Sequence, residues 1–146
     1  MMKYLPFVSA ELGETMHRGT RWQRIALWVV VFWFLLDGLA HFAFTDFEAR
    51  MVPPQIPDAP DVVLIVGAFE LLGAFGLLLP WTRRVAGWGL LLLTLAVMPA
   101  DAWMLHVHDQ LQIPVWLLWL RLPLQLLLLW LVWWGSRWRA VRRRWY

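Results

Sequence analysis

Ionisable side chains interrupt each of the four apolar stretches of this sequence. Such groups are rare in membrane-embedded helices because hydrocarbon cannot solvate a charge, and those that occur usually face the interior of a helix bundle. They are Asp37 and His41 in the first stretch, Glu70 in the second, Asp101 in the third and Arg121 in the fourth. We therefore expect the four stretches to direct these side chains toward one shared polar site.

The charges of these residues indicate proton chemistry. Arginine stays protonated and can hold one carboxylate through two parallel hydrogen bonds, and we expect Glu70, which has a similar depth, to be the main partner of Arg121. Because three carboxyl groups share this one cation, at least one of them should be neutral or be compensated by His41, a cation or a ligand. A neutral carboxyl group can donate a proton. Glu70, Asp101 and His41 are therefore the candidate catalytic residues, with proton transfer as their role.

The spacing of the polar residues predicts a pocket. Asp37 and His41 are four positions apart, as are Arg121 and Gln125, so each pair shares one face of a helix. With a rise of about 1.5 Å per residue, the ionisable residues all fall in the same half of the bilayer. We expect a pocket that opens toward the outer side, below the proline-rich segment at 53–57.

Two further groups lie near the predicted mouth of the pocket. Trp103 and Trp119 could stack on an aromatic or quinone ring, although tryptophan is also common at membrane interfaces. His106, His108 and Asp109 have a spacing that can bind zinc, copper or nickel, but histidines in an exposed third loop are more often only solvated, and we predict no metal site. The predicted ligand-binding residues are Asp37, His41, Glu70, Asp101, Trp103, Trp119, Arg121 and Gln125.

Four helices must position these side chains. The sequence is 61% hydrophobic with 13 Trp, and its mean hydropathy is +0.57, which is more apolar surface than one soluble domain can bury. Each apolar stretch is long enough to cross the hydrocarbon as a helix. We predict an all-α, up-down four-helix transmembrane bundle at 25–134, between a tail at 1–24 and a basic tail at 135–146. The predicted helices are 25–44, 62–79, 85–105 and 114–134.

The distribution of positive charge predicts the orientation. Of the 13 Lys and Arg residues, all but Arg50 and Arg121 flank the helices on one side, and that side is cytoplasmic by the positive-inside rule. We therefore expect both termini in the cytoplasm and a multi-pass protein of the cell inner membrane, with the lipid bilayer as its main partner. The basic tail is interpreted as an anchor on anionic headgroups and not as a nucleic-acid interface. The absence of cysteine excludes disulfides and thiolate metal sites.

Small residues and prolines surround the ionisable positions. Glycine and alanine flank Glu70, which favours close packing of that helix face against a neighbour. Pro99 and Pro123 lie two residues from Asp101 and Arg121, and each leaves a backbone carbonyl without its helical donor. Both features indicate that these residues face the bundle interior.

Short motifs follow one another from Gly38 to Trp134. They are Gly38-x-x-His41-Phe42, Met51-Val52-Pro53-Pro54, Glu70-Leu71-Leu72-Gly73 with Leu78-Leu79-Pro80, Thr82-Arg83-Arg84, Pro99-Ala100-Asp101 and Arg121-Leu122-Pro123-Leu124-Gln125. Taken together they resemble the DoxX-like family of small four-helix bacterial membrane proteins. The resemblance implies a link to quinone-coupled oxidation. Asp101 departs from it, since relatives are expected to carry Asn there.

The sequence supports more than one function. The leading hypothesis is a quinone-linked redox accessory or ligand-binding subunit, in which Arg121 and His41 bond the carbonyl oxygens of a quinone and an oxidoreductase partner supplies the electrons. The alternative is a non-enzymatic membrane organiser or assembly factor whose polar residues only fix helix packing. A lipid isomerase or a proton-coupled exporter would also suit a protonatable outward pocket.

Overall fold

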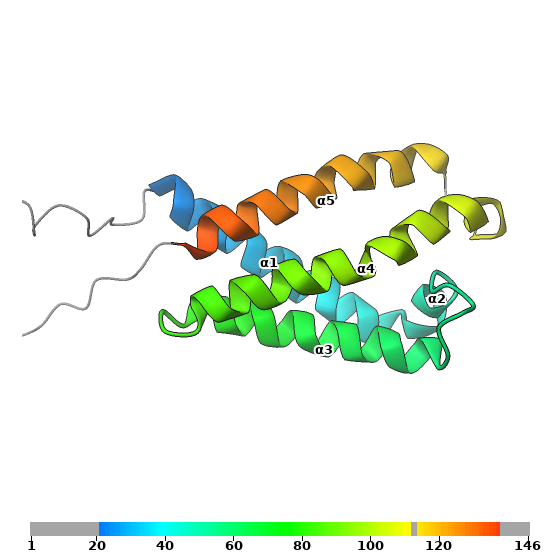
Figure 1. Ribbon diagram of the computed structural model, residues 1–146, viewed down its shortest axis with the longest axis horizontal. Coiled ribbons are helices and arrows are strands. Elements are labelled where there is room, and N and C mark those ends of the chain that lie inside the picture. The colour runs from blue at the N-terminus through cyan, green and yellow to red at the C-terminus, as the bar shows by residue number, and fades with distance from the viewer. Residues whose placement is uncertain (1–20, 112–113, 138–146) are drawn as a thin grey trace, which may run out of the picture.

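The computed structural model describes residues 21–111 and 114–137. Within that part the fold is all-helical, as predicted (Figure 1). The helices are α1 (Arg21–Ala43), α2 (Thr45–Ala49), α3 (Ala59–Leu78), α4 (Arg83–Leu111) and α5 (Val115–Ser136). By length and composition, all except α2 are able to cross a membrane, which makes this a multi-pass membrane protein. Residues 138–146 of the predicted basic tail at 135–146 lie outside the described residues, as do residues 1–20 of the predicted N-terminal tail.

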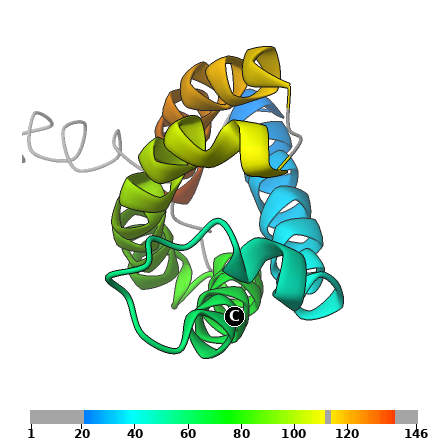
Figure 2. The same cartoon turned by 90° about the vertical axis from the view of Figure 1, so that its right-hand side faces the viewer.

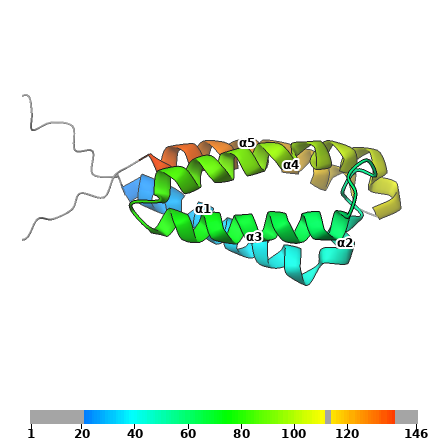
Figure 3. The ribbon, with the colours of Figure 1, turned by 60° about the horizontal axis from the view of Figure 1, so that its bottom comes forward.

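The four long helices form a ring. α1 and α4 each pack against both α3 and α5, so the order around the bundle is α1, α3, α4, α5, and α3 lies diagonally opposite α5 (Figure 2). The start of α1, the end of α5 and the turn at 79–82 lie at one end, here called the termini end (Figure 1). α2 and the loop at 50–58 lie at the other, here called the α2 end (Figures 1 and 3).

Most predicted boundaries differ from the structure by one to three residues, and two differ by four or more. α1 includes Arg21 to Arg24, ahead of the predicted start at residue 25, because a helix can continue into the polar interface where Trp and Arg side chains are solvated. α4 continues past residue 105 to Leu111, because the sequence has no glycine or proline between Leu105 and Pro114 to end it. His106 and Asp109 therefore belong to the last turns of a helix and not to a loop.

The connection between α1 and α3 contains a helix that the sequence analysis did not predict. Thr45 begins α2, and its hydroxyl donates to the carbonyl of His41 at 2.7 Å, which ties the short helix to the last turn of α1. The prolines at 53, 54 and 57 follow in irregular backbone, as expected of residues that lack an N–H donor. Asp58 then adopts a left-handed conformation with φ of 52° immediately before α3.

The hydrophobic core lies toward the termini end. Arg83 is buried beside it at the start of α4, where its Nε donates to the carbonyl of Leu77 at 2.8 Å and so satisfies an unpaired acceptor at the end of α3. Residues from all four long helices form the core, namely Leu27, Val30, Val31, Phe34, Ala74, Leu77, Leu90, Leu128 and Val132. This half of the bundle is packed side chain against side chain.

α1 and α3 approach each other most closely at two glycines. A Cβ added to Gly67 would lie 2.7 Å from the Cβ of His41, and one added to Gly38 would lie 3.1 Å from the carbonyl oxygen of Gly67. The small residues around Glu70 thus permit tight helix packing, as the sequence predicted. This packing positions both His41 and Glu70 on the inner side of the α1–α3 contact.

Candidate functional site

A cavity of about 540 Å³ lies between the four long helices at the α2 end. The irregular loop contributes Met51, Val52 and Ile56 to its lining, so the apolar residues of the proline-rich loop do border the pocket, as expected. Most of the other lining residues are also apolar. The volume falls within the range of pockets that hold small molecules.

Six of the eight predicted ligand-binding residues line this cavity. Each i,i+4 pair points into it as the helical spacing predicted: Asp37 with His41 from α1, and Arg121 with Gln125 from α5. Gln125 also donates through Nε2 to the carbonyl of Thr94 at 3.3 Å, which links α5 to α4. The other two of the six lining residues are Glu70 from α3 and Asp101 from α4.

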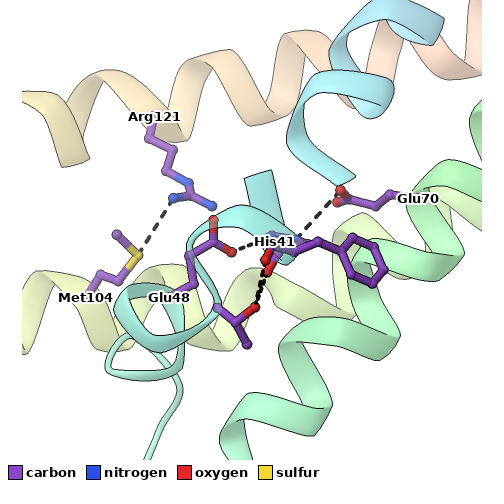
Figure 4. Close-up of polar contacts among 7 residues, drawn as sticks. His41, Glu48, Glu70, Met104 and Arg121 are labelled. Carbon is purple, nitrogen blue, oxygen red and sulfur yellow. Dashed lines mark hydrogen bonds and ion pairs between the residues drawn. The ribbon is translucent and has the colours of Figure 1, made fainter. Parts of the chain in front are cut away.

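Arg121 pairs with Asp101 and not with Glu70. Its Nε lies 2.9 Å from Oδ1 of Asp101, and its Nη1 lies 3.7 Å from Sδ of Met104, one turn along α4 (Figure 4). The expected pairing with Glu70 is therefore wrong. The physical reason is the order of the helices around the ring, since α5 packs against α4 whereas α3 is diagonally opposite. Equal depth alone does not bring two side chains together.

His41 stands between two carboxyl groups. Its Nδ1 forms a short polar contact with Oε2 of Glu48 in α2, and its Nε2 lies 3.6 Å from Oε2 of Glu70 in α3 (Figure 4). The imidazole therefore lies between a half-buried carboxyl group on α2 and a buried one on α3. An imidazole can give up a proton at one nitrogen and accept one at the other. Because 3.6 Å is longer than a hydrogen bond, proton transfer along these three groups would require Glu70 to approach His41 more closely.

Glu48 is the cavity residue that the sequence analysis missed. It lies in a segment that had been interpreted as loop, seven residues after His41, and its carboxyl group lines the cavity. The Thr-x-x-Glu spacing of Thr45 and Glu48 resembles a helix start, although in the structure Phe44 is the N-cap and the hydroxyl of Thr45 bonds the carbonyl of His41. Recognition of that pattern would have placed a short helix, and with it Glu48, at the end of α1.

The cavity contains more acid than base. Asp37, Glu48, Glu70 and Asp101 face one guanidinium and one imidazole. Oε2 of Glu70 and Oδ2 of Asp101 are buried without a hydrogen bond, and no hydrogen bond or ion pair joins Asp37 to any other residue in the part of the chain that the structure describes. Unpaired acceptors in a low-dielectric site are costly, so protons or a ligand with donor groups would stabilise them.

Trp103 and Trp119 do not line the cavity. Each lies two residues from a cavity residue, Asp101 or Arg121, and two positions on a helix correspond to a turn of about 200° toward the opposite face. Trp119 is exposed on the outside of α5. Trp103 instead lies against the ring of His106, with ring centroids 5.3 Å apart.

The predicted histidine cluster falls on the last turns of α4. His108 lies there too, but its side chain is outside the described residues. Within residues 21–111 and 114–137, no group of three or more His, Cys, Asp or Glu side chains is placed to hold a metal ion.

Comparison with known proteins assigns the chain to a family. The model of a family described as a domain of unknown function, DUF8561, matches residues 29–136, from within α1 to the last residue of α5. This chain belongs to that family. No curated protein and no solved structure matches the chain. The DUF8561 segment includes every ionisable residue of the cavity.

Proposed function

We propose that this DUF8561 protein binds a small amphipathic molecule in the cavity at the α2 end. The observation that carries the proposal is the placement of two buried carboxyl oxygens without hydrogen-bond partners, on Glu70 and Asp101, beside a cavity of about 540 Å³. A site lined by apolar side chains with a few convergent polar groups is the usual form of a small-molecule pocket.

The ligand class that we propose is a quinone, with the protein acting as an accessory or ligand-binding subunit of an oxidoreductase. Quinone carbonyl oxygens are acceptors, and the guanidinium of Arg121 and the imidazole of His41 carry N–H donors around one cavity. Reduction of a quinone consumes protons, which the chain Glu48, His41, Glu70 could deliver, while the partner enzyme supplies the electrons. The motif resemblance to the DoxX-like family supports the same assignment.

Binding can be tested directly in lipid nanodiscs. A dimethoxybenzoquinone should bind the wild type, measured by native mass spectrometry and by titration. Glu70→Leu, which removes both carboxyl oxygens, should weaken binding about tenfold, the loss expected of one hydrogen bond to an ionisable group. Asp61→Asn, an exposed change in the first turn of the same helix, should leave binding unchanged. If the quinone does not bind the wild type, or if both variants behave alike, this proposal fails.

We also propose that the termini end is cytoplasmic and that the protein resides in the cell inner membrane. The positive-inside rule supports this orientation, since Arg83, Arg84 and Arg137 all belong to the termini end. Because the chain has no cysteine, single cysteines can be labelled cleanly. An impermeant maleimide added to intact cells should label Gln55→Cys in the α2-end loop and should label Arg84→Cys only after permeabilisation. The reverse pattern would invert the orientation.

A purely structural role is the second candidate. The ion pair of Arg121 with Asp101 supports it, since it satisfies the one cation of the cavity by a protein group alone. Under this hypothesis no small molecule is retained, and Glu70→Gln lowers the thermal stability of the purified protein without any ligand-dependent effect. Native mass spectra of the wild type, recorded before quinone is added, separate the two candidates.

A further inference from the structure

Among the four long helices, the large exposed side chains of the cavity lining belong to α1 and α5. Trp33 is 46% and Leu120 is 49% exposed. On α3 and α4, Glu70, Asp101 and Met104 are buried, with relative exposures of 5%, 6% and 4%, and the exposed lining residues are the small Ala96 and Pro99 of α4. Side chains that line an interior cavity and are also half exposed mark the place where the cavity reaches the surface of the bundle.

The course of α1 and α5 explains this opening. At the termini end the two helices are close, and a Cβ added to Gly135 would lie 3.4 Å from the backbone nitrogen of Leu27. Toward the α2 end they diverge, and α1 follows α3 while α5 follows α4 (Figures 1 and 3). The side chain of Arg121 on α5 is 46% exposed even though it pairs with Asp101 of α4. The opening is therefore lateral, in the part of the bundle that a membrane surrounds.

A groove on the outside of α1 leads into the same opening. It has a volume of about 670 Å³ and extends from Trp28 to Ala40, a length of roughly 18 Å at the rise of an α-helix. Trp33 and Asp37 line both the groove and the cavity, so the two spaces border the same pair of side chains. Apart from Asp37 the groove is apolar, whereas six ionisable residues line the cavity.

We propose that the gap between α1 and α5 is a lateral entrance, and that the ligand is a lipid with a polar ring and a long hydrocarbon chain. The ring occupies the cavity, and the chain lies in the groove on α1. This inference rests on the proposed function, because it takes the cavity as a ligand site in a membrane. It narrows the ligand to molecules that partition into the bilayer, since a chain-free polar molecule would leave the apolar groove unused.

The chain groove can be tested with two probes that differ only in their tail. Leu36→Trp places a larger side chain in the groove, and Leu92→Trp is its matched control, an exposed leucine on α4 that lines neither space. In nanodiscs, Leu36→Trp should weaken binding of a dimethoxybenzoquinone with a long alkyl chain by about tenfold and should not affect the chain-free ring. Leu92→Trp should affect neither. Equal weakening of both probes by Leu36→Trp, or no weakening, would overturn the groove assignment.

A second experiment tests the entrance without any quinone. Thr94→Cys places a thiol on a buried residue of the cavity wall, and Leu90→Cys places one in the packed core. A long-chain maleimide dissolved in phosphatidylcholine vesicles should react with Thr94→Cys much faster than with Leu90→Cys. Addition of Leu120→Trp at the gap should slow the reaction several-fold, while Leu92→Trp should not.

The two experiments separate the entrance from the ligand. If labelling follows this pattern but neither quinone binds the wild type, the quinone proposal fails and the lateral entrance stands. If Thr94→Cys is as unreactive as Leu90→Cys, or if Leu120→Trp has no effect on its rate, the entrance is refuted whatever the quinones do.

Discussion

The two ends of the bundle use the same four helices in different ways. At the termini end, large apolar side chains such as Phe34 and Leu77 fill the interior, and the one buried arginine, Arg83, bonds backbone carbonyls of α3. At the α2 end the interior is a cavity with four carboxyl groups. The comparison indicates that stability is concentrated at one end, so that the other can hold polar groups that would weaken a packed core.

The largest expected difference between the two ends is the loss of folding stability when a leucine is shortened to alanine. Leu77→Ala removes a fully buried side chain from the core and should lower the free energy of unfolding by about 2–5 kcal/mol. Leu93→Ala makes the same change on the cavity wall, where no packed neighbour fills the interior, and should cost about 1 kcal/mol or less. Unfolding in detergent, followed by circular dichroism against added denaturant, measures both. Equal losses would show that the α2 end is packed as tightly as the termini end.

A second, smaller effect tests whether α1 and α3 are tightly packed against each other beside the cavity. Gly67→Ala forces a methyl group against His41 at the α1–α3 contact and should destabilise the fold by about 1–3 kcal/mol. Gly89→Ala is the control, because a Cβ there meets nothing within 4 Å, and it should stabilise α4 by about 0.5–1 kcal/mol. Opposite signs in thermal melts would confirm that the α1–α3 side is closed. A harmless Gly67→Ala would mean that α1 can shift away from α3.

The smallest expected effect concerns the ion pair. In a double-mutant cycle, Arg121→Leu and Asp101→Leu should show a coupling free energy of about 0.6–1.7 kcal/mol, the range found for polar pairs between membrane helices. The same cycle with Glu70→Leu in place of Asp101→Leu should be additive within about 0.5 kcal/mol. Coupling of Arg121 to Glu70 instead would restore the pairing that depth alone had suggested. Denaturant unfolding of the six proteins supplies the values.

Much of the site could be anticipated because helical spacing is a local property. The i,i+4 relation placed Asp37 with His41 and Arg121 with Gln125 on single faces, and all four line the cavity. The prediction that Trp103 and Trp119 line the site was wrong, because the depth of a residue in the membrane does not determine which face of its helix it occupies. Trp119 points outward. Glu48 was overlooked because its position depends on a five-residue helix that is too short for a hydrophobic period to reveal.

By itself the sequence determined that the chain makes four long apolar helices and that each carries an ionisable residue, because apolar length and helical period are written along the chain. It also determined that α3 can pack closely, through the glycines near Glu70. Only the tertiary structure decided which charges meet. Because of the order of the helices around the ring, Arg121 pairs with Asp101, and His41 lies between Glu48 and Glu70. The divergence of α1 from α5 toward the α2 end separates the two helices beside the cavity. Such features depend on contacts between residues far apart in the chain, which no local pattern specifies.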